Sequence, residues 1–391
     1  MTTITLRRSK TTTYASTHHY KKPSDIARFH LMKPLLFGHE RIQQDLLKAS
    51  RTGRLPQVLL ITGDQGVGRQ SFGRWLAAVV LCQSAASPCG ACQSCRLVSG
   101  LTHPDFHWFV PLPRPKAGDP DKQMDEVRES LGELMAARRE TPVYGPPDGM
   151  AMHGVATARL ILKCGALTTV MGGRRVFLIG DAERLVPQEA SQEAANALLK
   201  FLEEPPASAL ILLTTTDPNR VLPTIRSRAV PIRLGRLDPA TVAAGLAALA
   251  PDLPEAERRR RVATAEGSLG KALGATATAK TDEQVEQLLT VARQGGAQRF
   301  ERVMRQGPWQ ARGDFTELLD RLASTLSQAV RVASGGLDAP VPEALRTVAS
   351  PTRFLIAIEK VDAAREAAQG NVNPQLLLAT LTGELAEALW A

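Results

Sequence analysis

The stretch that decides the fold is Gln57-Val58-Leu59-Leu60-Ile61-Thr62-Gly63-Asp64-Gln65-Gly66-Val67-Gly68-Arg69-Gln70. Its first six residues form a short apolar run rich in β-branched side chains, which predicts a buried strand. Gly63 ends this run, and a glycine-rich turn follows it. Apolar residues then recur with a helical period from Ser71 to Leu81. Strand, loop and helix in this order open a βαβ unit.

The glycine-rich turn has the spacing of a phosphate-binding loop, G-x-x-x-x-G-K-[ST], but not its two chemical residues. Arg69 stands in place of the lysine that reaches phosphate, and Gln70 stands in place of the hydroxyl that binds magnesium. Arginine keeps the charge in a different shape. We therefore take Gly63, Gly66, Gly68 and Arg69 as a degenerate phosphate loop, which can still offer backbone N–H groups to an anion. A plain strand–helix turn is the alternative.

Two further apolar runs, 175–179 and 209–214, also predict buried strands, and helical patterns lie between the strands. This alternation predicts an α/β fold with a mostly parallel sheet. No strand pattern follows residue 235. The segments 238–276 and 281–391 are amphipathic on a helical period, with Phe300, Trp309 and Phe315 as expected core residues.

These patterns divide the chain into four parts. Residues 1–31 carry six basic side chains against one aspartate and lack hydrophobic periodicity, so we expect a disordered tail or a misassigned start; a DNA-binding arm is the alternative. Residues 32–235 form the α/β domain, in which 111–150 is expected to be a surface insertion rich in proline and glycine. Residues 236–280 and 281–391 are expected to be two helical domains.

Four cysteines follow the helix of the first βαβ unit with C-x6-C-x2-C-x2-C spacing: Cys82, Cys89, Cys92 and Cys95. Four thiolates this close in sequence suit a tetrahedral zinc ion. A complete shell of protein ligands leaves no position for water, so the zinc is expected to be structural. Four unconnected thiols or a redox pair are the alternatives.

The composition excludes several classes of protein. Of the 391 residues, 43% are hydrophobic and 22% are charged, which is typical of a soluble globular chain of two or three domains. No apolar run approaches the roughly 18 residues of a membrane span. Five cysteines do not form the disulfide framework of a small secreted protein. A cytoplasmic location is expected.

Several stretches together resemble the AAA+ clamp-loader subunits of bacterial DNA polymerase III, and the resemblance spans about residues 34–391. Besides the four-cysteine module at 82–95, it rests on His103-Pro104-Asp105, Asn196-Ala197-Leu198-Leu199-Lys200-Phe201-Leu202-Glu203-Glu204-Pro205-Pro206, Thr214-Thr215-Thr216-Asp217-Pro218-Asn219, Leu222-Pro223-Thr224-Ile225-Arg226-Ser227-Arg228 and Asn371-Val372-Asn373-Pro374. The resemblance implies an AAA+ P-loop domain with an inserted zinc module, a small helical lid at 236–280 and a helical collar at 281–391.

Clamp loaders of this family contain motor subunits that hydrolyse ATP, called gamma or, in a longer form, tau. They also contain a stator subunit that lends an arginine finger to a neighbouring motor. The finger lies in a Ser-Arg-Cys motif, which reads Ser227-Arg228-Ala229 in this chain. The resemblance therefore implies that Arg228, with Ser227 beside it, stabilises phosphate charge in a neighbouring subunit.

Three further positions depart from the motor pattern. Gly180 stands where motors place the aspartate for magnesium, and Asp181 stands where they place the catalytic glutamate. Gly270 replaces the lid arginine that touches nucleotide, and Lys271 lies about 100° further round the helix. Against the family pattern these residues favour weak or absent ATP binding and no hydrolysis.

The resemblance thus implies a non-catalytic stator of a DNA polymerase III holoenzyme. Its partners would be the gamma or tau and delta subunits and, through the complex, the sliding clamp and primed DNA; no membrane is involved. Two alternatives stay open: an active gamma/tau-type motor subunit with an unusual loop, and an AAA+ adaptor outside replication.

Overall fold

The computed structural model describes residues 36–116, 118–140, 151–185, 193–294, 296–297, 299, 301, 312–335, 341–369 and 372–391. The expected N-terminal tail lies outside these residues, as do Phe300 and Trp309. Within the described ranges, none of the helices combines the length and the apolar character needed to span a bilayer.

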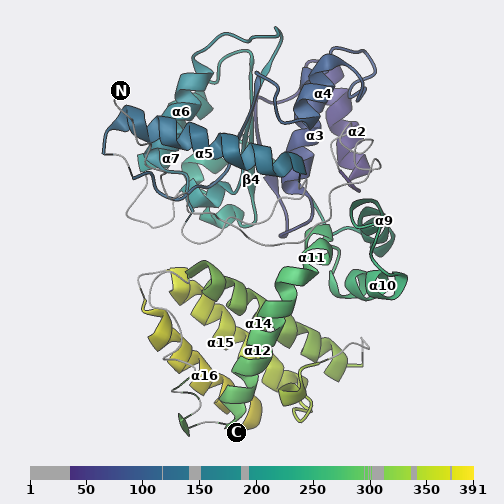
Figure 1. Ribbon diagram of the computed structural model, residues 1–391, viewed down its shortest axis with the longest axis vertical. Helices are drawn as coiled ribbons and strands as arrows, with labels where there is room; N and C mark the ends of the chain where they lie inside the picture. Colours follow the sequence, from purple (N-terminus) through teal and green to yellow (C-terminus); the bar gives the residue numbers. More distant parts are fainter. Residues whose placement is uncertain are drawn as a thin grey trace, which may run out of the picture.

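A five-stranded parallel sheet forms the centre of the first part of the chain (Figure 1). Its order is β2-β3-β4-β1-β5, with bounds Phe106–Phe109 for β2, Arg175–Ile179 for β3, Ala209–Thr215 for β4, Val58–Thr62 for β1 and Val230–Arg233 for β5. Every pairing is parallel. The predicted α/β class and its three central strands are confirmed. The two edge strands were not predicted, because each has four residues and β5 buries only Ile232.

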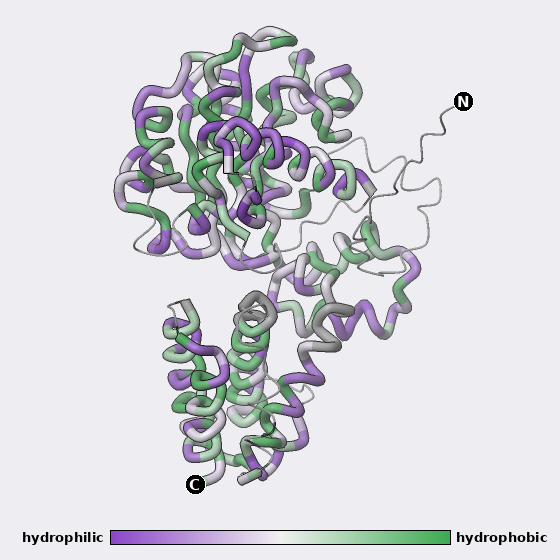
Figure 2. Tube along the Cα trace, turned by 60° about the vertical axis from the view of Figure 1, so that its left-hand side comes forward, coloured by the Kyte–Doolittle hydropathy of each residue, from purple (hydrophilic) through white to green (hydrophobic). Residues whose placement is uncertain are grey.

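Helices cover the sheet and share one hydrophobic core with it. They are α2 (Glu40–Arg51), α3 (Arg69–Leu81), α4 (Gln93–Ser99), α5 (Pro120–Glu140), α6 (Val155–Gly165), α7 (Glu193–Glu203) and the short α8 (Pro223–Arg226), with 3-10 turns at Ala182–Leu185 and Pro218–Arg220. Phe72 of α3 and Phe177 of β3 are fully buried in this core. Figure 2 colours the chain by hydropathy and shows hydrophobic stretches in both the α/β part and the helical parts.

The segment 111–150 is not only a surface insertion. Leu112 forms an antiparallel bridge with Met152, and α5 buries Val127 and Leu131 in the main core. These two residues are four positions apart, so they form one apolar stripe on an otherwise charged helix. The high charge of the segment hid this stripe in the sequence.

The remaining helices form two smaller cores. The helices α9 (Pro239–Leu249), α10 (Glu255–Thr264) and α11 (Leu269–Leu273) pack around Val242 and Leu246. The helices α12 (Ala275–Gln294), α14 (Arg312–Ala333), α15 (Pro351–Gln369) and α16 (Pro374–Trp390), with a 3-10 turn at Glu343–Leu345, pack around a third cluster that includes Phe315, as predicted. Figure 1 shows α9–α11 beside the α/β part and α12–α16 as a separate helical body.

Candidate functional site

The glycine-rich loop lies at the carboxyl end of β1, where parallel α/β folds place their ligand sites. Gly66 and Gly68 have φ of 79° and 101°, in the left-handed region that favours glycine. Gly68 is the N-cap of α3, and its carbonyl accepts the first helical hydrogen bond, from Phe72 N at 2.8 Å. The loop thus runs directly into the N-terminus of α3, in the strand–loop–helix order that the sequence predicted.

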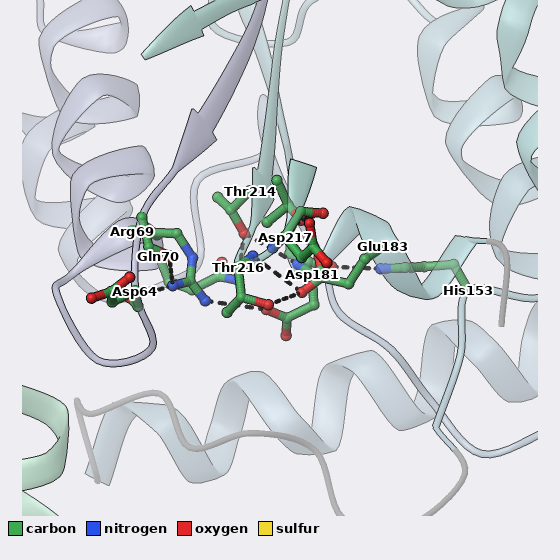
Figure 3. Close-up of polar contacts among 12 residues, drawn as sticks. Asp64, Arg69, Gln70, His153, Asp181, Glu183, Thr214, Thr216 and Asp217 are labelled. Atoms are coloured by element: carbon green, nitrogen blue, oxygen red, sulfur yellow. Dashed lines mark hydrogen bonds and ion pairs between the residues drawn. The ribbon is translucent and has the colours of Figure 1, made fainter. Parts of the chain in front are cut away.

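The side chain of Arg69 folds back onto the loop that precedes it (Figure 3). Its Nη1 donates to the carbonyl oxygens of Gly63, at 2.6 Å, and of Asp64. Its Nη2 lies 3.8 Å from a carboxylate oxygen of Asp181. Arg69 is 7% exposed. The cation at the position expected to bind phosphate therefore already makes its contacts within its own chain.

Gln70 fills the space beside the end of β3. Its amide nitrogen donates to Thr214 Oγ1 at 2.9 Å, and its amide oxygen accepts from Trp108 Nε1 at 3.1 Å. A Cβ atom added to Gly180 would lie 2.4 Å from Gln70 Nε2. A side chain at position 180 would therefore require the Gln70 amide to leave its bonds with Thr214 and Trp108.

Two acidic residues follow β3, and both are held by the end of β4. Asp181 has a φ of 51°, and its backbone N–H donates to Thr214 Oγ1 at 3.1 Å. One carboxylate oxygen of Glu183 accepts from Thr216 Oγ1 at 2.7 Å. Beside them, the ring of buried His153 donates to the Gly180 carbonyl at 2.6 Å, and its burial lowers its pKa to about 4. Figure 3 shows these side chains converging at the strand ends.

The helix α11 packs directly on the loop. Ser268 Oγ donates to the Gln65 carbonyl at 2.8 Å, and Gly270 N donates to the Gly66 carbonyl at 2.9 Å. A Cβ atom at Gly270 would lie 2.7 Å from Gly66 Cα, so the approach requires glycine at this position. Lys271 points elsewhere, as predicted, and lies 3.7 Å from Glu266.

Ion pairs connect the loop to both helical parts. Asp64 accepts from Arg236 Nε at 2.8 Å, and Arg236 Nη1 lies 4.0 Å from Glu266. Glu266 also pairs with Arg331 of α14. Most of these groups are exposed, and single exposed pairs contribute little to stability. Together they form a continuous chain of ion pairs that joins the loop, the α9–α11 part and the C-terminal helices.

Arg228 lies just beyond α8, away from the loop and half-buried. Its guanidinium pairs with Glu203 and donates to the Thr224 carbonyl at 2.6 Å and to Ser227 Oγ at 3.3 Å. Ala229 is buried, so a small residue at the third motif position fits its surroundings. No contact between described residues joins Arg228 to the glycine-rich loop. The structure thus places the two sets of predicted site residues apart.

The four cysteines Cys82, Cys89, Cys92 and Cys95 lie together, with every pair of sulfur atoms within 4.8 Å. The Sγ–Sγ distances are 3.9 Å for Cys82–Cys92 and 4.0 Å for Cys89–Cys95. A tetrahedral zinc ion with bonds of about 2.3 Å requires sulfur separations of about 3.8 Å. The cluster therefore has the size and the ligand chemistry of a zinc site.

The cluster is prepared to hold thiolates, because backbone N–H groups point at its sulfur atoms. Cys92 N donates to Cys89 Sγ at 3.3 Å, and Cys95 N donates to Cys92 Sγ at 3.4 Å. Donation from the backbone of Ala91 and Cys92 lowers the pKa of Cys89 to about 6. His103 is engaged elsewhere: its Nδ1 accepts from Asp105 N at 3.0 Å, and its Nε2 contacts Ser94 Oγ.

Sequence reasoning missed the side chains that complete the site. Trp108 and Thr214 hold Gln70, and they belong to an unpredicted strand and to the end of a predicted one. The run Thr214-Thr215-Thr216 at a strand end was the available signal for hydroxyl partners. Ser268, two residues before Gly270, bonds the loop through its hydroxyl.

Comparison with known proteins identifies the family to which the chain belongs. The family described as "DNA polymerase III, delta subunit" matches residues 38–238, just over half of the chain. A delta-prime subunit of DNA polymerase III from Pseudomonas aeruginosa is 35% identical over 173 residues, which are 44% of this chain and 40% of that protein. A tau subunit from Salmonella typhimurium is 30% identical over 203 residues, 51% of this chain and 25% of that protein.

The chain thus spans less than half of the length of these curated relatives. Among solved structures, a gamma-subunit-related protein from Thermotoga maritima aligns over 88% of this chain and 99% of its own, with 17% identity and a TM-score of 0.36. Because the family match covers residues 38–238, the chain belongs to the DNA polymerase III delta-subunit family of clamp-loader proteins.

Proposed function

We propose that this chain is the delta-prime-type stator of a clamp loader: it neither binds ATP firmly nor hydrolyses it, and it lends Arg228 to a neighbouring ATPase subunit. The observation that carries the proposal is that the chain's own residues fill its phosphate loop. Arg69 bonds to the loop carbonyls, the Gln70 amide lies where a Cβ atom at position 180 would be, and Gly270 lies against Gly66.

Each of these contacts removes one requirement of phosphoryl transfer. The loop cation would have to leave two carbonyls and Asp181 to meet a phosphate. No carboxylate at position 180 is available to hold magnesium, which neutralises the developing charge in such reactions. The N-terminus of α11 lies against the loop, where the phosphates would have to enter. Together they favour a closed scaffold over a motor.

Arg228 supplies the second half of the proposal. It is the cation of the Ser227-Arg228 motif, and its contacts among the described residues are an ion pair with Glu203 and hydrogen bonds to the Thr224 carbonyl and to Ser227 Oγ. A partly exposed ion pair is weak enough to be exchanged for a stronger phosphate contact. Because guanidinium binds phosphate in a bidentate manner, Arg228 would stabilise the γ-phosphate in the neighbour's transition state.

The four thiolates would hold a structural zinc ion, which supplies a fixed cross-link between the end of α3 and the start of α4. The helices α12–α16 would form the collar with equivalent helices of gamma or tau and delta partners, over residues 281–391. The α9–α11 part, about 236–280, would be the lid. The assembled loader, acting in the cytoplasm, would place the sliding clamp on primed DNA.

A reconstituted loader tests this proposal. We would assemble the chain with its motor and delta subunits and measure ATP hydrolysis in the presence of clamp and primed DNA. Arg228→Ala should lower the rate severalfold without changing assembly, since the altered subunit hydrolyses nothing itself. The loss should be partial, because only one ATP site borders this chain.

Arg226→Ala is the matched control. Arg226 has the same charge two residues earlier and donates to Asn219 Oδ1 at 3.1 Å. Equal losses from both substitutions would assign the effect to general positive charge, and no loss from Arg228→Ala in an intact loader would remove the finger. ATP turnover by the isolated chain would instead favour the motor alternative suggested by the tau relatives.

A further inference from the structure

Arg74 is buried on α3, one turn beyond Gln70. Arg74 is 7% exposed, and no hydrogen bond or ion pair to it is found among the described residues. Its Nε is buried and has no acceptor. Burying a charged group is costly unless a partner of opposite charge or an acceptor compensates for it. Among the described residues, no acidic group or hydrogen-bond acceptor compensates for the charge of Arg74.

A second guanidinium group and an aromatic ring lie close to Arg74. The Cζ atom of Arg74 lies 5.6 Å from the centre of the Trp108 ring, and that of Arg138 lies 4.5 Å from the same ring. Burial, and then repulsion from Arg138, lower the pKa of Arg74 to about 10. The indole compensates in part through cation–π attraction. Two guanidinium groups thus converge on one ring from two different helices.

We propose that Arg74, Arg138 and Trp108 form a binding site for a small oxyanion of the phosphate or sulfate type. The N–H groups of a guanidinium match two oxygens of such an anion, and one anion between two guanidinium groups would neutralise their repulsion. Arg138 is partly exposed on α5, so the cluster reaches solvent there. Arg74 and Trp108 are almost fully buried, which excludes the backbone of a nucleic acid.

This site is separate from the glycine-rich loop. Arg69, not Arg74, contacts the loop carbonyls, and the link between the two regions is the hydrogen bond from Trp108 to Gln70. An anion at Arg74 would therefore steady Trp108 and, through it, the Gln70 contact at the end of β3. The inference does not depend on the stator role, since it concerns a ligand of the isolated chain.

Tryptophan fluorescence gives a direct test, because Trp108 is part of the site. The full chain would be titrated with inorganic phosphate at constant ionic strength maintained with chloride. We expect a saturable change in the wild-type chain, and at least tenfold weaker binding in Arg74→Met and Arg138→Gln. Arg128→Gln is the matched control: it removes the same charge from the same helix, at a side chain that is 55% exposed and paired with Asp125. This control should bind as the wild type does.

A second readout separates the site from a general salt effect, since phosphate and sulfate stabilise many proteins by exclusion from their surface. Trp108→Phe should lose the fluorescence change but keep a rise in thermal midpoint with phosphate, which Arg74→Met should lose. Arg74→Met keeps the buried stem and removes the charge, so without phosphate its midpoint should equal or exceed that of the wild type.

Arg138→Gln alters a partly exposed helix end and carries the same test without changing the core. A non-saturating change of equal size in every variant would overturn the proposal. An Arg74-dependent response to a short single-stranded oligonucleotide, with none to inorganic phosphate, would also overturn it, because the ligand would then be nucleic acid.

Discussion

Gln70 and Gly180 fit together as a pair: the amide of Gln70 lies where any side chain at position 180 would begin, 2.4 Å from a Cβ atom placed there. The family pattern expects a magnesium-binding hydroxyl at the position of Gln70 and a magnesium-binding carboxylate at the position of Gly180. In this chain the two positions are in direct contact, so we expect a change at one to affect the other. Restoring either residue alone would disturb a packed site without rebuilding the metal site.

Gly180→Ala should destabilise the chain by about 1–3 kcal/mol, the usual cost of overpacking a tight core position. In a Gln70→Ala background the same substitution should cost clearly less, because the clashing amide is gone, and a double-mutant cycle measured by urea unfolding isolates this coupling. Gly132→Ala is the control, since a Cβ there meets nothing within 4 Å. Additive effects of the two changes would contradict the pairing.

Gly270→Ala should loosen the contact between α11 and the loop. Its Cβ would lie 2.7 Å from Gly66 Cα, and a backbone atom cannot move aside as a flexible side chain can. We expect faster amide hydrogen exchange at residues 63–70 and 268–273, with the C-terminal helices unchanged. Gly383→Ala in α16 meets nothing within 4 Å and should leave exchange at the loop as it is. Unchanged loop exchange in Gly270→Ala would refute a tight closure.

The purified chain should contain one zinc ion per molecule, as measured by elemental mass spectrometry. Cys92→Ala should lose the metal and increase proteolysis between residues 82 and 99, while the sheet stays folded because its core lies elsewhere. Cys164→Ala is the control, because this thiol lies outside the cluster. Zinc retained by Cys92→Ala, or absent from the wild type, would contradict a four-thiolate site. Acid should release the zinc, since protonated thiols do not bind it.

The stability of the chain should fall as the pH is lowered from about 6.5 to about 4. Burial lowers the pKa of His153 from 6.5 to about 4, so in this range the unfolded chain takes up a proton that the folded chain does not. The difference corresponds to roughly 3 kcal/mol when complete. His153→Asn should flatten this part of the pH profile of urea unfolding, relative to its own stability at pH 7. A profile as steep as that of the wild type would assign the acid sensitivity to other groups.

The parts of the fold that depend on local sequence could be predicted. The three central strands are continuous apolar runs, and Gly63, Gly66 and Gly68 lie at fixed spacing between strand and helix. The four cysteines lie within one short segment, so their spacing alone indicated a common site. Asn373 stands before Pro374 at the start of α16, and its side chain accepts from Gln375 N.

What could not be predicted depends on contacts between distant segments. Gly270 meets Gly66 across about two hundred residues, and nothing near either glycine indicates the other. The return of the Arg69 side chain to its own loop is a choice of rotamer that the sequence does not encode visibly. The stripe of Val127 and Leu131 was hidden by the charge of its helix. The sequence identified the unusual residues, and the structure supplies the reason they belong together.

Nucleotide binding by the isolated chain tests the central claim most directly. The purified, zinc-containing chain would be titrated with magnesium ATP by calorimetry, with its folded state verified by circular dichroism. We predict no saturable binding up to millimolar ATP, because Arg69, Gln70 and Gly270 already occupy the loop and its surroundings. Saturable binding at micromolar ATP would contradict the account, since it would mean that the loop opens readily and that the chain retains the site of a motor subunit.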